Sequence, residues 1–145
     1  MTEAKGLEAI NPATGIIIAT YPLMNQEAII KAIDRAHSGF QQWKHSAFSA
    51  RSKALTQASR VLKANKVALA ECITQEMGKP IQQSFAEVEK CAWVCDYFAT
   101  NAQQHLSDET IELDQKNAIV TAQPLGILFA VMPWNFPLWQ AFRAI

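Results

Sequence analysis

The sequence lacks an excess of charge, because its 145 residues carry 13 basic and 13 acidic side chains. No long-range electrostatic field that would gather nucleic acid or an anionic membrane surface is therefore expected. The sequence also lacks any stretch that approaches the ~18 consecutive apolar residues of a membrane span. Residues 1–5 do not open the apolar segment of a signal peptide. We therefore expect a cytoplasmic protein with neither nucleic-acid nor membrane partners.

Cysteine and histidine are scarce, with three residues of each type. Cys72, Cys91 and Cys95 are odd in number and show no CxxC spacing, which argues against a disulfide framework and against a zinc site. Cys91 and Cys95 lie on or beside an apolar helical stripe, so we expect small core residues there. No two histidines have the spacing of a metal-binding pair such as HxxxH. We expect no metal site.

The sequence does contain a large apolar fraction, 50% of the chain, which suffices for one packed domain. Apolar residues recur at spacings of three and four in four stretches and predict four helices. The stretches are Ile29–Trp43, Leu55–Leu62, Leu69–Met77 and Ile81–Ala102. Asn25 is the expected N-cap of the first helix, whose stripe should be buried. Asn65 should separate the second helix from the third, and Gly78 and Pro80 should end the third.

Two hairpins are expected from short extended runs on either side of turn residues. The first pairs Leu7–Ala9 with Ile16–Ile18 across a turn at Asn11–Gly15. The second pairs Thr110–Asp114 with Ile119–Ala122 across Gln115–Asn117. Two strands alone are marginally stable, so the second hairpin must pack on something, which could be another subunit.

The end of the chain predicts a strand, a loop and a helix. Leu125–Met132 is apolar on both faces, as in a strand within a parallel sheet, and Pro137 can begin a helix. Ligands bind at the carboxyl ends of strands in open α/β sheets, which is where the loop Pro133–Pro137 would lie. Asn135 in this stiff loop either donates its amide hydrogens to an oxygen that gains charge in acyl-type chemistry or caps the next helix.

Four segments carry a resemblance to a known family. They are, in chain order, NPATG at Asn11–Gly15, EMGKP at Glu76–Pro80, PLG at Pro124–Gly126 and PWNFPL at Pro133–Leu138. In order and separation they resemble the N-terminal part of the aldehyde dehydrogenase superfamily, over nearly the whole chain. The resemblance implies the α/β class and the helix-rich N-terminal part of a Rossmann-type cofactor domain, with a β-hairpin oligomerisation arm.

The resemblance also assigns regions and roles. Residues 1–107 would form the N-terminal hairpin and helices, 108–123 the arm of a homo-dimer or homo-tetramer, and 124–145 the first strand, loop and helix of the nucleotide-binding sheet. NAD or NADP would lie beside the four residues of the loop entrance, and the last of these would form the oxyanion hole. The four are Met132, Pro133, Trp134 and Asn135.

The family reaction joins an aldehyde to a cysteine thiolate, passes hydride to the nicotinamide, and hydrolyses the thioester with a glutamate as general base. The resemblance places that cysteine and that glutamate beyond Ile145, together with the catalytic domain. We therefore expect a partial chain that is inert by itself. The choice between NAD and NADP also depends on residues beyond this point.

Arg143 follows Asn135 by eight positions, about 12 Å along a helix, and its side chain should lean back toward the loop. Arginine grips carboxylates in a bidentate fork, whereas a solvated helix arginine is the alternative. An arginine at this offset resembles succinate-semialdehyde dehydrogenases, with Phe136 and Gln140 lining the same channel. We therefore expect oxidation of succinate semialdehyde to succinate.

Other functions remain open from the sequence. One is a dehydrogenase of another small aldehyde, such as glutarate semialdehyde, a keto-acid semialdehyde or an amino aldehyde. Another is a non-catalytic structural or interaction module formed by the hairpin and helices.

Overall fold

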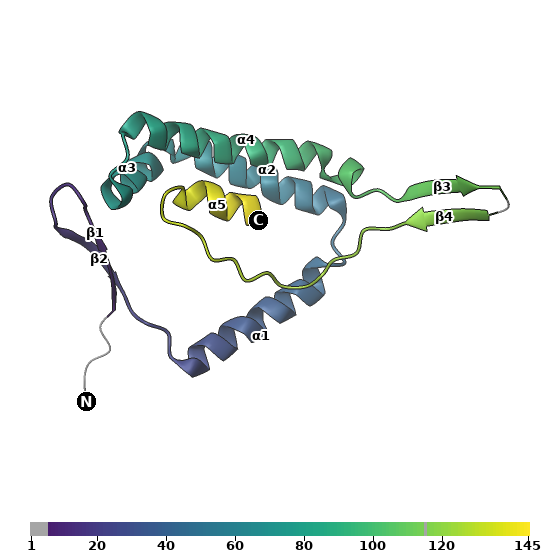
Figure 1. Ribbon diagram of the computed structural model, residues 1–145, viewed down its shortest axis with the longest axis horizontal. Coiled ribbons are helices and arrows are strands. Elements are labelled where there is room, and N and C mark those ends of the chain that lie inside the picture. Colours follow the sequence, from purple (N-terminus) through teal and green to yellow (C-terminus); the bar gives the residue numbers. More distant parts are fainter. Residues whose placement is uncertain (1–5, 115) are drawn as a thin grey trace.

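The computed structural model describes residues 6–114 and 116–145. The expectations about the start of the chain and about a turn at Gln115 lie outside these residues. The described part is helix-rich, with two small antiparallel hairpins (Figure 1). No helix in it has the length and apolar character to cross a membrane. In chain order the elements are β1 (Leu7–Ile10), β2 (Ile17–Tyr21), α1 (Gln26–Trp43), α2 (Phe48–Ala64), α3 (Lys66–Met77), α4 (Ile81–His105), β3 (Glu109–Leu113), β4 (Lys116–Val120) and α5 (Pro137–Ala144).

The core lies between α4 and the three helices that pack on it, α2, α3 and α5 (Figure 1). Its members are small or branched residues that recur at helical spacing, as the apolar stripes predicted. They are Leu62, Ala70, Ile73, Val88, Cys91, Ala92 and Cys95. The prediction that Cys91 and Cys95 are core residues is confirmed, since both are free and buried.

The predicted breaks between the helices are confirmed. Asn65 ends α2 and donates its side-chain amide to the carbonyl oxygen of Val61 at 2.8 Å. Gly78 ends α3 with φ +77°, the left-handed conformation that glycine adopts without a Cβ clash. The chain then turns through Pro80 directly into α4.

The first hairpin is also confirmed, with β1 antiparallel to β2. Asn11 builds its turn, because the Asn11 Oδ1 atom accepts a hydrogen bond from the Ala13 N–H at 2.9 Å. Gly15 closes the turn with φ +71°.

Helix α1 forms where predicted, with the side chain of Asn25 capping the N–H of Ala28 at 2.8 Å. The expectation of a buried face was wrong for this structure: no residue of α1 is buried, and Ile33 and Trp43 are each 51% exposed. Figure 1 shows the reason, because α1 lies apart from the helices of the core. An apolar stripe specifies that a face can be buried, not which element covers it.

The second hairpin, β3 with β4, projects from the end of α4 and is exposed along its whole described length (Figure 1). Lys116 and Asn117 were predicted in the turn but pair with Leu113 and Glu112 in the ladder. The second strand correspondingly ends at Val120, before Ala122.

The strand predicted over Leu125–Met132 does not form in this structure. Leu125 is 99% exposed and Phe129 is 93% exposed. A parallel strand needs neighbouring strands to receive its backbone hydrogen bonds, and the described residues supply none beside this segment. The helix after it is confirmed, since α5 begins at Pro137 with proline in the first turn.

Candidate functional site

The start of α5 is fixed by a side chain from another helix. The N-cap residue of α5, Phe136, offers no side-chain acceptor. The Glu87 carboxylate from α4 caps the helix instead, because its Oε1 atom accepts hydrogen bonds from the N–H groups of Leu138 and Trp139, each at 3.0 Å. These are the first two N–H groups of α5, since Pro137 has none. A carboxylate at this position also complements the positive end of the helix dipole.

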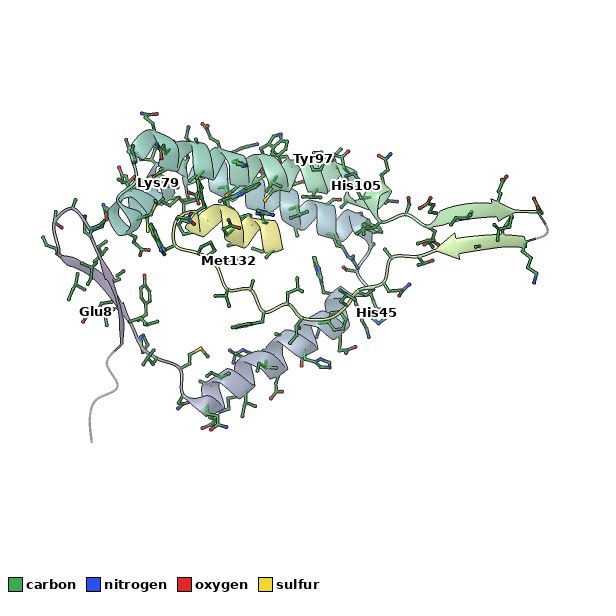
Figure 2. The ribbon with its side chains drawn as sticks, in the orientation of Figure 1. Glu8, His45, Lys79, Tyr97, His105 and Met132 are labelled. Carbon is green, nitrogen blue, oxygen red and sulfur yellow. The ribbon has the colours of Figure 1, made fainter. Side chains whose placement is uncertain are left out.

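Lys79 completes this arrangement. Its ammonium nitrogen lies 2.5 Å from the Glu87 Oε2 atom, and the two side chains are only 3% and 1% exposed. The same nitrogen lies 4.1 Å from the centroid of the Phe136 ring, within cation–π range. Figure 2 labels Lys79 near the junction of α3 and α4 and Met132 in the segment that leads to α5. One buried ion pair therefore connects the α3–α4 junction to the loop before α5.

Three of the four motifs that carry the resemblance meet beside this pair. Pro12 from the first hairpin lies against Gly78, since a Cβ atom built on Gly78 would be 2.8 Å from the Pro12 Cγ atom. A hollow of about 510 Å³ lies at this junction. It is lined by Pro12, Glu76, Met77, Met132, Pro133, Trp134 and Pro137.

A second hollow, of about 470 Å³, lies between α4 and α5. Phe136 and Gln140 line it together with Gln83, Ala86, Glu87, Lys90 and Trp139. The Lys90 ammonium lies 4.1 Å from the centroid of a Trp139 ring, so a cation stands at the wall of this hollow. Aromatic faces, an amide and a cation can together hold a short aliphatic molecule with an anionic end.

The predicted site residues are thus placed in three groups. Met132, Pro133 and Trp134, predicted beside the cofactor, line the first hollow. Phe136 and Gln140, predicted at the substrate, line the second. Asn135 and Arg143 are exposed and line neither of the two.

The role of Asn135 as a helix cap, one of the two alternatives for this residue, is not what the structure shows. Phe136 occupies the N-cap position, and the Glu87 carboxylate bonds the first two N–H groups of α5. The oxyanion role stays a prediction.

Lys79 and Glu87 were not predicted as site residues. Lys79 stood in the EMGKP segment without an assigned role. Glu87 could have been noticed as a charge among the buried positions of α4, between Ser84 and Cys91. A carboxylate so placed must have partners, because an unpaired buried charge is strongly disfavoured. Nothing in the local pattern identifies those partners.

The three thiols have the electrostatics of structural cysteines. Burial, with the nearby Glu87 carboxylate, raises the pKa of Cys91 to about 12. Burial is also the main cause that raises the pKa of Cys95 and of Cys72. A nucleophilic cysteine needs a lowered pKa, so none of these thiols is suited to that role.

The sequence is similar to one family of known proteins along its whole length. The family model described as "Aldehyde dehydrogenase family" matches residues 1–145. The chain is 41% identical over 137 residues to a probable succinate-semialdehyde dehydrogenase [NADP(+)] of Synechocystis sp., covering 94% of this chain and 30% of that protein. It is 38% identical over 143 residues to a succinate semialdehyde dehydrogenase [NAD(P)+] of Escherichia coli, covering 99% and 31%.

A solved structure is similar as well. The succinic semialdehyde dehydrogenase of Streptococcus pyogenes, crystallised with NADP+, superimposes with a TM-score of 0.89 at 31% identity, over 94% of this chain and 30% of that one. The chain therefore spans about three tenths of the length of the relatives it matches.

Proposed function

Because this chain belongs to the aldehyde dehydrogenase family, we propose that it forms the N-terminal part of the Rossmann-type cofactor domain of a longer enzyme. That enzyme oxidises an aldehyde to a carboxylic acid with NAD or NADP. The substrate is succinate semialdehyde and the product succinate. The nucleophile and the general base come from outside residues 1–145.

One observation carries the proposal for the loop. Asn135 is exposed on a segment held between Pro133 and Pro137, and α5 is already capped by Glu87. Its amide is therefore available to donate to the oxygen that becomes negative when a nucleophile adds to the aldehyde carbon. Such a preorganised donor stabilises the transition state more than the ground state.

The nicotinamide ring would lie against the first hollow. Most of its wall is apolar and stiff, since Met132, Pro133 and Pro137 line it beside the exposed indole of Trp134, and Glu76 is the one acidic residue of the lining. The nicotinamide group accepts hydride from the substrate carbon when it is bound. The residues of this wall would orient the ring and exclude water from it. The names of the relatives include NADP+ and NAD(P)+, and both cofactors remain in the proposal.

The second hollow supports the choice of substrate. Phe136 and Gln140 line it, and Arg143 follows Gln140 within α5. From Pro137 to Arg143 the helix rises about 9 Å at ~1.5 Å per residue, and the long arginine side chain would lean back toward the loop that carries Asn135. A short aliphatic chain that ends in a carboxylate would extend from the asparagine toward the guanidinium, which would bind the carboxylate in a bidentate fork. The names of the Synechocystis and Escherichia coli relatives favour the same substrate.

The second hairpin and the segment Leu125–Met132 would both make contacts with residues outside this chain. Residues 108–123 would form the arm of a homo-dimer or homo-tetramer, because the β3–β4 hairpin projects and buries nothing of its own. Leu125–Met132 would join a parallel sheet supplied by the longer protein. Its nearly complete exposure at Leu125 and Phe129 is what such a missing neighbour would leave.

The test is kinetic and uses the full-length protein with succinate semialdehyde and the neutral four-carbon aldehyde butanal. Arg143→Ala should raise KM for the semialdehyde by about 10- to 100-fold, the loss of a charge-assisted hydrogen bond, and leave KM for butanal unchanged. Asn135→Ala should lower kcat for both aldehydes by about 100-fold or more. Arg35→Ala, on exposed α1, is the matched control.

Equal effects of Arg143→Ala on both aldehydes would remove the argument for an acidic substrate. A panel with glutarate semialdehyde, a keto-acid semialdehyde and an amino aldehyde then identifies the preferred one. Full-length protein without turnover of any aldehyde would favour a non-catalytic module instead.

A further inference from the structure

The geometry points to Glu87, held by Lys79, as a positioning residue for the loop that carries Asn135. We propose that this buried ion pair sets the place of the asparagine amide. Glu87 also lines the second hollow, but in this role both residues act through the loop and not on the reacting atoms or the cofactor. The inference rests on the proposed function of Asn135.

The N-terminus of α5 follows Asn135 by two residues, and its first two N–H groups both donate to a single oxygen, Glu87 Oε1, at 3.0 Å. Glu87 lies on the buried face of α4, between the buried residues Ser84 and Cys91, so this oxygen is held at the packed interior of the helices. The backbone just after Asn135 is therefore attached to the core at one point.

The Glu87 carboxylate is also held in one orientation. Lys79 binds the other oxygen of Glu87 at 2.5 Å, so both oxygens are engaged and the plane of the carboxylate is fixed. The same ammonium lies over the ring of Phe136, the residue between Asn135 and Pro137. Lys79 thus holds both the acceptor of α5 and the aromatic ring next to the asparagine.

A purely stabilising role is a poor explanation for the pair. Buried ion pairs often contribute little net stability, because desolvation offsets the attraction of the charges. What this pair does supply is a fixed geometry, and a misplacement of a catalytic group by roughly 1 Å can cost about 100-fold in rate. The consequence of disturbing it should therefore appear in kcat.

The experiment is a double-mutant cycle in the full-length enzyme, with kcat expressed per active site from the pre-steady-state burst of reduced cofactor. Glu87→Gln keeps the shape of the side chain and removes the charge that Lys79 binds. It should lower kcat by about 10- to 100-fold with KM for the cofactor unchanged. Glu89→Gln, two residues along α4 and paired with Lys66 at the surface, is the matched control and should leave kcat unchanged.

The cycle is completed in the Asn135→Ala background. If Glu87 acts through Asn135, Glu87→Gln should cause no further loss there, since the amide it positions is already gone. A full independent loss in that background would overturn the proposal, as would wild-type kcat in the single variant. Wild-type kcat in Asn135→Ala would instead overturn the proposed function, whatever Glu87→Gln does.

A second pair of variants applies if Glu87→Gln does not fold. Lys79→Met should lower kcat as Glu87→Gln does. Lys79→Arg, which keeps a cation beside Glu87 and Phe136, should retain most of the wild-type kcat. Equal kcat in these two variants would contradict the positioning role.

Discussion

Replacing Gly78 with alanine tests how closely the first hairpin is seated on the end of α3. The substitution meets two obstacles. Gly78 has φ +77°, and the new Cβ atom would lie 2.8 Å from the Pro12 Cγ atom. The left-handed conformation destabilises the folded state of an alanine variant by about 1 to 2 kcal/mol. Alanine also lowers the conformational entropy of the unfolded chain, which offsets about 0.4 to 1 kcal/mol of that cost. The steric overlap adds about 1 to 2 kcal/mol.

Two other glycines separate these contributions. Gly15 has φ +71° with open space around its Cβ position. Gly15→Ala should therefore lower the free energy of unfolding by about 1 kcal/mol, through the unfavourable backbone dihedral alone. Gly39 lies within α1 with neither obstacle, and Gly39→Ala should stabilise by about 0.5 to 1 kcal/mol. Gly78→Ala should cost about 2 to 3 kcal/mol in total.

The assay is urea unfolding of each variant followed by circular dichroism, with extrapolation to water. A double-mutant cycle with Pro12→Ala isolates the overlap, because that change removes Cγ and leaves Cβ at an ordinary 3.7 Å. The cycle should return a coupling of about 1 to 2 kcal/mol. Equal costs for Gly78→Ala and Gly15→Ala, with no coupling to Pro12, would refute the close packing of the hairpin on α3.

Two further predictions concern acid–base behaviour and helix capping. The pKa of Cys91 rises from 9.0 to about 12 on folding, so its contribution to stability is complete below pH 9 and is lost as the pH rises toward 12. Urea midpoints measured from pH 8 to 11 should fall less in Cys91→Ala than in the parent, and parallel profiles would contradict this. Asn25→Ala removes the cap of the Ala28 N–H and should destabilise α1 by about 1 kcal/mol. Hydrogen exchange at the first turn of α1 should accelerate, whereas Asn65→Ala should leave it unchanged.

The helices were predictable because their determinants are local. Apolar spacing defines α2, α3 and α4, and the breaks at Asn65 and Gly78 act within one turn of the chain. The turn at Asn11 is equally local, since its side chain bonds a backbone group two residues away.

The predictions that were wrong depended on partners far away or outside the described residues. A buried strand at Leu125–Met132 requires a sheet, and a buried face on α1 requires something to cover Ile33. The loop motif was recognisable as a resemblance, but its support was not. Glu87 bonds Leu138 and Trp139 across about fifty residues, a separation that no local pattern encodes.

The charges around the second hollow bear on the proposed substrate. Glu87 contributes a negative charge to its wall, but Lys79 and the positive end of α5 both bind that carboxylate. A helix N-terminus amounts to about half a positive elementary charge. The charges of Glu87, Lys79 and the α5 N-terminus therefore sum to a small net positive charge. Lys90 adds a further cation beside Trp139. In the proposed function, this balance would favour a substrate with a carboxylate over a neutral aldehyde, even without the contribution of Arg143.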